Sequence, residues 1–151
     1  MLINSLQQLF TRDLNKLKEE IALYKGESNL WRTDKNISNS AGNLCLHLAG
    51  NLKTFIGAVI GETGYIRNRP EEFAAKNIPR EVLLKSIDEV ISVVEESLQK
   101  LPEENLEKEY PMQVFDRPFT YEQFLLHLYG HLMYHLGQIN YHRRLLDHFD
   151  V

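Results

Sequence analysis

The stretch from Thr120 to Asp147 (TYEQFLLHLYGHLMYHLGQINYHRRLLD) constrains the fold more than any other part of the chain. Its aliphatic residues recur three and four positions apart, which is the spacing of one face of an α-helix. These residues are Leu125, Leu128, Leu132, Leu136, Ile139 and Leu145. Thr120 and Gln123 form a capping-box pattern at the start of the run. The stretch therefore predicts a long helix that must bury one face against other helices.

Three further segments show the same apolar periodicity and predict helices. The first runs from Leu2 to Tyr24, the second from Ser38 or Ser40 to Gly61, and the third from Pro79 to Leu101. Four amphipathic helices in a chain of 151 residues predict an all-α, four-helix bundle in a single domain, residues 1–151. The glycines of the second segment lower its intrinsic helicity but permit a close neighbouring helix.

Two long connections separate the last three predicted helices. The connection of residues 62–78 is long for neighbouring antiparallel helices and could cross over between two parallel ones. The connection of residues 103–119 contains a short extended candidate, Tyr110–Phe115, which is interrupted by proline. Residues 26–37 read as a polar loop that contains the only tryptophan, Trp31, which is expected to pack against the helices.

Charge and cysteine content exclude several classes of function. The formal net charge is −4, and no run of basic residues exceeds the pair Arg143–Arg144, so nucleic acids and anionic membranes are poor partners. Cys45 is the only cysteine, and no internal disulfide can form. The N-terminus lacks the pattern of a signal peptide, and no window approaches the ~18 apolar residues of a membrane span. We therefore expect a cytoplasmic protein without a membrane or nucleic-acid partner.

Histidines mark the candidate functional site. His127, His131 and His135 are spaced four residues apart and share one stripe of the last predicted helix. Eight residues of helix rise about 12 Å, whereas metal–nitrogen bonds are about 2.1 Å, so only an adjacent pair can bind one ion. The third ligand must then come from another helix, where His47 is suitably placed. Spacing alone leaves open whether His127–His131 or His131–His135 is the pair.

Polar residues accompany His47 on its face of the second helix. Asn43 and Asn51 lie one turn before and after it and are expected to line a wet cavity. Cys45 faces away from His47 and is not expected to bind metal. In the last helix, His142 is expected to be structural or exposed, as is His148 beyond it.

The isolated histidine in NLCLHL, followed by H-x3-H-x3-H-x-G-Q from His127 to Gln138, resembles the DinB-like superfamily of four-helix metalloproteins. That superfamily includes bacillithiol transferases and mycothiol-dependent maleylpyruvate isomerases. The resemblance implies that His47, His131 and His135 bind metal, that the bundle has up-down-down-up topology, and that the protein is a homodimer. It also implies a cavity role for His127, since some members carry a histidine there that is usually not a ligand.

Three neutral imidazoles suit a divalent zinc or nickel ion first, with iron and copper as alternatives. Three protein ligands leave coordination positions for water or substrate, as in catalytic sites. Each ligand imidazole also needs a partner for its other ring nitrogen, for which Asn51 and Gln138 are candidates beside backbone carbonyls.

Two functional hypotheses remain open from the sequence. One is a metal-dependent transferase or hydrolase that acts on a small molecule; by the resemblance, a low-molecular-weight thiol would attack an electrophile. The other is a non-catalytic dimeric bundle that binds a metal or a small ligand.

Overall fold

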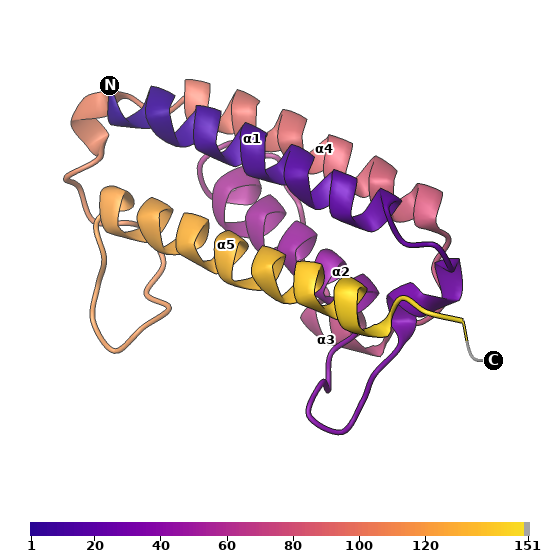
Figure 1. The fold of residues 1–151 in the computed structure, drawn as a ribbon. Coiled ribbons are helices and arrows are strands. Elements are labelled where there is room, and N and C mark those ends of the chain that lie inside the picture. Colours follow the sequence, from indigo (N-terminus) through magenta and orange to yellow (C-terminus); the bar gives the residue numbers. More distant parts are fainter. Residues whose placement is uncertain (150–151) are drawn as a thin grey trace.

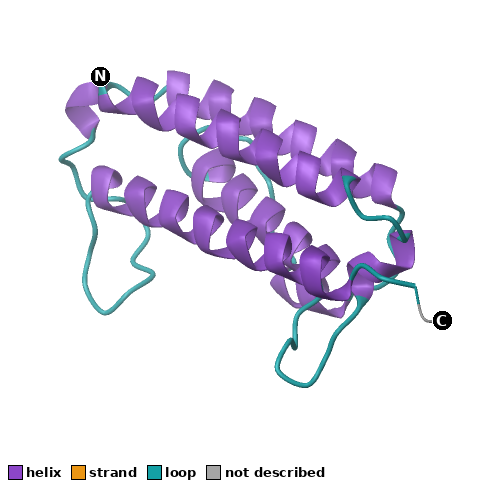
Figure 2. Cartoon of the chain, viewed as in Figure 1, coloured by secondary structure: helices purple, strands orange, loops and turns teal. Residues whose placement is uncertain are grey.

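The computed structural model describes residues 1–149, and helices dominate this part of the chain (Figures 1 and 2). Its α-helices are α1 (Leu2–Ala22), α2 (Ala41–Leu52), α3 (Arg69–Ala74), α4 (Arg80–Gln99) and α5 (Tyr121–Leu146). The expected all-α class is confirmed. Within residues 1–149 the only β-type pairings are isolated bridges, Asp34 with Ile37 and Glu109 with Thr120. None of the described helices combines the length and the apolar character needed to cross a membrane.

The four long helices pack around a common core. Helix α1 lies against α4 and α5, and α2 lies against the same two helices from the other side (Figure 1). At one end, Nη2 of Arg80 donates to the carbonyl of Tyr24 at 2.8 Å. The amide of Lys25 donates to the carboxylate of Asp147 at 2.7 Å. The start of α4 and the end of α5 therefore both meet the end of α1, so α1 is antiparallel to α4 and parallel to α5.

Helix α2 runs antiparallel to α5 and parallel to α4. Phe55, in the turn that follows the end of α2, contacts Phe124 at the start of α5, with 5.2 Å between ring centroids. Lys53 pairs with Glu89 of α4 at 3.0 Å, and Nζ of Lys100 donates to the carbonyl of Gly61 at 3.0 Å. The connection of residues 62–78 thus crosses over between parallel helices, as its length permitted.

The second predicted helix changes its geometry before it ends. Beyond Leu52 the chain forms a π-helical turn, Lys53–Ala58, in which the hydrogen bonds span five residues. The carbonyl of Phe55 in this turn accepts a hydrogen bond from the hydroxyl of Tyr110 at 2.8 Å. A Cβ on Gly57 would press against Val93 of α4, so the close helix approach expected from the glycines is present here.

The extended candidate at Tyr110–Phe115 does not form a strand. The amide of Tyr110 donates to the carbonyl of Phe119 beside the isolated bridge of Glu109 with Thr120, but no ladder continues through the stretch. The side chain of Tyr110 is buried and stacks on Phe124, with ring centroids 4.2 Å apart. Pro111 also removes a backbone donor that a ladder would use.

The connections contain helical turns that the periodicity did not predict. Helix α3 lies inside the long crossover, where the side chain of Asn68 accepts from the amide of Glu71 and Pro70 occupies the first turn. A 3-10 turn, Glu27–Trp31, follows α1. The Trp31 ring lies where a Cβ on Gly42 would be, so Trp31 packs against the start of α2 as expected.

Helix α5 forms as predicted. Thr120 and Gln123 make both hydrogen bonds of the capping box. The apolar band faces the core except at Leu145, which is exposed, and Leu125, Leu132 and Ile139 are fully buried. The opposite side of the helix remains exposed, and the histidine stripe lies between the two faces.

Candidate metal centre

Three histidines from two helices converge beside the core. His47 of α2 meets His131 and His135 of α5, and one ring nitrogen from each lies within 4.8 Å of the other two. The Nε2 atom of His131 is 3.1 Å from Nε2 of His47 and 3.1 Å from Nε2 of His135. The structure thus brings together His131–His135, the second of the two pairs that spacing left open.

The separations fit a shared cation. Two nitrogens bound at about 2.1 Å in tetrahedral geometry lie about 3.4 Å apart. The two measured Nε2 distances of 3.1 Å are close to that value, and the group has no carboxylate ligand. The donor set is one of three borderline-soft imidazoles.

A buried ion pair holds the outer nitrogen of His47. Nδ1 of His47 lies 3.1 Å from Oε1 of Glu72, a residue of α3. Arg67 binds the same carboxylate with two hydrogen bonds, from Nε to Oε2 and from Nη2 to Oε1, each 2.8 Å. Because a carboxylate only accepts, Nδ1 of His47 carries the proton and Nε2 keeps its lone pair toward the centre.

The other two histidines differ in their outer contacts. Nδ1 of His135 lies 2.7 Å from Oε1 of Gln138, which is an acceptor, so the lone pair of His135 also sits on Nε2. Nδ1 of His131 is buried and has no hydrogen-bond partner among the described residues. The Nε2 lone pairs of His47 and His135 both point to Nε2 of His131. A proton on Nε2 of His131 can form a hydrogen bond with at most one of them, so the other calls for a cation.

Burial favours the neutral form of His47 and His131. It lowers the pKa of His47, and the Glu72 hydrogen bond only partly offsets that effect. Burial, followed by the neighbouring His135 and His47, lowers the pKa of His131 to about 4. Neutral imidazoles near pH 7 are the protonation state that a metal requires.

The remaining predicted site residues lie outside the convergence. His127 packs edge-on against Phe115 at 4.7 Å and stays out of the three-histidine group, while burial lowers its pKa. Within residues 1–149, Asn51 is buried but has no hydrogen bond to a histidine, and its Oδ1 is unpartnered. The amide of Asn43 donates to the carbonyls of Glu72 and Ala75 at 3.0 and 2.8 Å.

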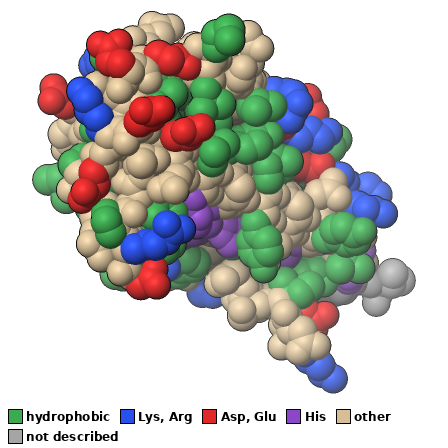
Figure 3. Space-filling view, turned by 90° about the vertical axis from the view of Figure 1, so that its left-hand side faces the viewer, with side chains coloured by type: hydrophobic (Ala, Val, Ile, Leu, Met, Phe, Trp, Pro, Cys, Tyr) green, Lys and Arg blue, Asp and Glu red, His purple; other side chains and the backbone are tan. Residues whose placement is uncertain are grey.

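The centre is open on one side. His47 is buried, whereas His131 and His135 are partly exposed. In Figure 3 histidine side chains reach the surface in a hollow, with hydrophobic groups and basic side chains around them. Solvent and small molecules therefore have access from this face.

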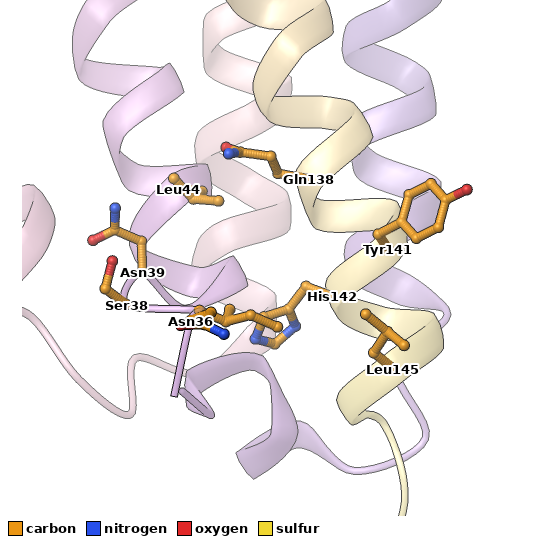
Figure 4. Close-up of a pocket in the computed structure, with 9 residues that line it drawn as sticks. Asn36, Ser38, Asn39, Leu44, Gln138, Tyr141, His142 and Leu145 are labelled. Carbon is orange, nitrogen blue, oxygen red and sulfur yellow. The ribbon is translucent and has the colours of Figure 1, made fainter. Parts of the chain in front are cut away.

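A neighbouring cavity of about 240 Å³ shares a residue with the centre. Gln138, the partner of His135, lines it and points toward Leu44 of α2 (Figure 4). Its described lining includes amide, hydroxyl, imidazole and aliphatic groups but no Asp, Glu, Lys or Arg. One wall is His142, which is buried and held by Tyr24 and the carbonyl of Arg32, a structural position as expected.

Sequence reasoning missed Arg67 and Glu72. Both lie in the crossover, which lacks the long periodicity that predicts a helix. Asn68 before Pro70, followed by acidic residues, is a helix-start pattern that could have revealed α3. Nothing in the sequence pairs Glu72 with His47, which lies 25 positions away.

Comparisons with known proteins identify a family that covers nearly the whole chain, but they give no activity. A search of the curated proteins finds no match to this chain. One family model matches residues 2–150, which is nearly the whole sequence and includes all three converging histidines. The chain therefore belongs to the family described as protein of unknown function (DUF1572).

Proposed function

We propose that the protein binds one divalent metal ion through His47, His131 and His135 and uses it in an enzymatic reaction on a small molecule. The observation that carries this proposal is the convergence of the three rings, two of which are fixed by outer partners with their lone pairs inward. The packing and directions of the long helices support an up-down-down-up bundle of the DinB-like kind. Zinc or nickel suits the donor set best, and iron or copper would also fit.

The reaction class follows from the open coordination positions. When bound, the ion would supply a Lewis acid that activates a water molecule or the thiol of a co-substrate. Glu72 and Gln138 hold the ligand rings, and the partly exposed His131 and His135 leave an approach from solvent. This arrangement serves a hydrolase, or a transferase that joins a low-molecular-weight thiol to an electrophile.

The cavity beside Gln138 provides room for the substrate. Its uncharged lining favours an electrophile whose recognised part is neutral and mixed polar–apolar. Gln138 lines the cavity and contacts the outer nitrogen of His135, so one side chain links the cavity to the metal centre.

We also propose a homodimer. The outward side of α5 exposes apolar side chains, among them Leu126 (47% exposed), Tyr141 (61%) and Leu145 (58%). These positions share one face of the helix, and a second copy would cover them.

Metal analysis of the purified protein tests the site. Under metal-replete conditions the wild type should carry one equivalent. His47→Ala, His131→Ala and His135→Ala should each weaken binding by more than about 100-fold, since loss of a ligand exceeds the 10–100-fold effect of losing an outer partner. His127→Ala is the matched control, because it removes a histidine of the same stripe that lies outside the group, and it should retain the metal. A wild type without metal would refute the proposal.

Activity separates the enzyme from a binding module. Metal-loaded protein is incubated with thiols and a panel of electrophiles, and product is measured. Turnover that is lost in His131→Ala and kept in His127→Ala would support the enzyme. Stoichiometric binding of a ligand without turnover would support a non-catalytic module instead.

A further inference from the structure

Glu72 is an unusual residue for its position in the chain. It sits on a two-turn helix in a connection, yet its side chain is almost fully buried, with 7% exposure. Its Oε1 faces Nδ1 of His47 at 3.1 Å, and Arg67 binds both of its oxygens. A buried carboxylate is costly unless it is paired and hydrogen-bonded, and here both conditions are met.

Helix α2 is built to receive this carboxylate. Asn43, one turn before His47, donates two hydrogen bonds to backbone carbonyls of α3 and fixes α3 against α2. Gly50, about one turn after His47, faces the carboxylate directly, and a Cβ there would overlap Oε2 of Glu72. Glycine in a helix interior is less favourable than alanine, so its use here fits the need for space.

We propose that Glu72 is a positioning residue, which fixes the proton of His47 on Nδ1 so that the lone pair on Nε2 faces the metal. This inference rests on the proposed metal site and adds residues that the site does not contain. Arg67 makes the role specific. Its Nη2 is only 3.3 Å from Nδ1 of His47, and as a donor it would favour the opposite tautomer if Glu72 were absent. Glu72 therefore accepts the hydrogen bond from Nδ1–H of His47 and also keeps the guanidinium of Arg67 engaged.

The tautomer of His47 is the direct measurement. Two-bond ¹H–¹⁵N correlation spectra of the metal-free protein distinguish Nδ1–H from Nε2–H, and the spectrum of His47→Ala assigns the signals. We expect Nδ1–H in the wild type. In Glu72→Ala we expect the proton on Nε2, because Arg67 would then donate to Nδ1. Glu71→Ala is the matched control: Glu71 is the neighbouring, exposed carboxylate of α3, and its removal should leave the wild-type tautomer.

Metal affinity, measured by competition with a chelator, is the second readout. Loss of an outer-shell partner weakens metal binding by about 10–100-fold. We expect Glu72→Ala near the upper limit and Glu72→Gln near the lower one, since the glutamine oxygen can still accept from Nδ1–H but carries no charge. Arg67→Ala/Glu72→Ala should recover part of the loss relative to Glu72→Ala, because the competing donor is gone. A merely structural role for Glu72 predicts no such recovery.

The two proposals fail in different ways. A wild type that binds no metal refutes the metal site, while the tautomer of His47 in the metal-free protein still decides the role of Glu72. Wild-type affinity and an unchanged tautomer in Glu72→Ala would overturn the positioning role. Should Glu72→Ala not fold, the tautomer of His47 in the metal-free wild type decides: a proton on Nδ1 supports the role, and a proton on Nε2 overturns it.

Discussion

Histidines of the same helix serve different ends in this protein. His131 and His135 converge with His47, whereas His127, one turn earlier, packs against Phe115. His142 is buried and hydrogen-bonded on both sides, with its Nδ1 2.7 Å from the hydroxyl of Tyr24 and its Nε2 2.9 Å from the carbonyl of Arg32. His127, His131 and His135 share the same residue type and the same helical spacing. The surroundings of each side chain therefore decide which histidine can bind an ion.

The burial of His142 predicts a pH-dependent stability. Burial lowers the pKa of His142 below its unfolded value, against smaller opposing effects of the Arg32 carbonyl and Asp147. The folded state therefore binds fewer protons than the unfolded one just below pH 6.5. The stabilising contribution is complete above pH 6.5 and is lost as the pH falls toward the folded pKa, at no more than about 1.4 kcal/mol per pH unit.

Urea denaturation at pH 7.5 and 5.5, with chelator present, measures this effect. The wild type should be less stable at pH 5.5, and His142→Gln should lose less stability between the two values because glutamine does not titrate. Part of the dependence should persist in His142→Gln, since burial also lowers the pKa of His47 and His127. Equal pH dependence in His142→Gln and wild type would contradict the prediction.

At the scale of elements, the contact between α2 and α3 depends on Gly50, which has no side chain and so leaves room for Glu72. Gly50→Ala should destabilise the protein, although alanine is the better helix former, because the added Cβ overlaps the Glu72 carboxylate. In the Glu72→Ala background the same change should be neutral or stabilising by up to about 1 kcal/mol. The urea-unfolding free energies of the wild type, the two single variants and the double variant form a double-mutant cycle that isolates this clash. Additive effects would mean that Gly50 is not there to admit Glu72.

Long and short elements differed in how well the sequence predicted them. The apolar periods predicted α1, α4 and α5 with small shifts at their ends, because a long amphipathic face specifies a helix locally. Helix α3 is held by contacts from α2, such as those of Asn43, and a segment of that length carries little periodicity. The π-helical turn Lys53–Ala58 likewise leaves the apolar pattern unchanged and was not foreseen.

The residues of the candidate site also differ in how well the sequence predicted them. The spacing of the α5 histidines required a third residue from another helix and pointed to His47. The choice of His131–His135 came from the resemblance, because both pairs have identical spacing. Glu72 and Arg67 reach the site only through the path of the crossover, which no local pattern encodes.

At the scale of the whole molecule, the exposed apolar side of α5 predicts self-association. Leu126→Glu/Tyr141→Glu should place charges in the proposed interface and convert the dimer to a monomer, as measured by light scattering. Val82→Glu is the control, because Val82 is similarly exposed (51%) but lies on α4. A wild type that is monomeric at high concentration, or a charged pair that leaves the dimer intact, would contradict this interface.

The residues that hold the ring of His47 lie in the crossover of residues 62–78, whereas the residues that would bind the metal lie on α2 and α5. The long helices supply the core and the three histidines, while the crossover brings the ion pair of Arg67 and Glu72 to the ring of His47. Exchanging this one loop would thus change the groups that hold the ring of His47 without rebuilding the scaffold. The segment is therefore a natural target for engineering the proposed metal centre.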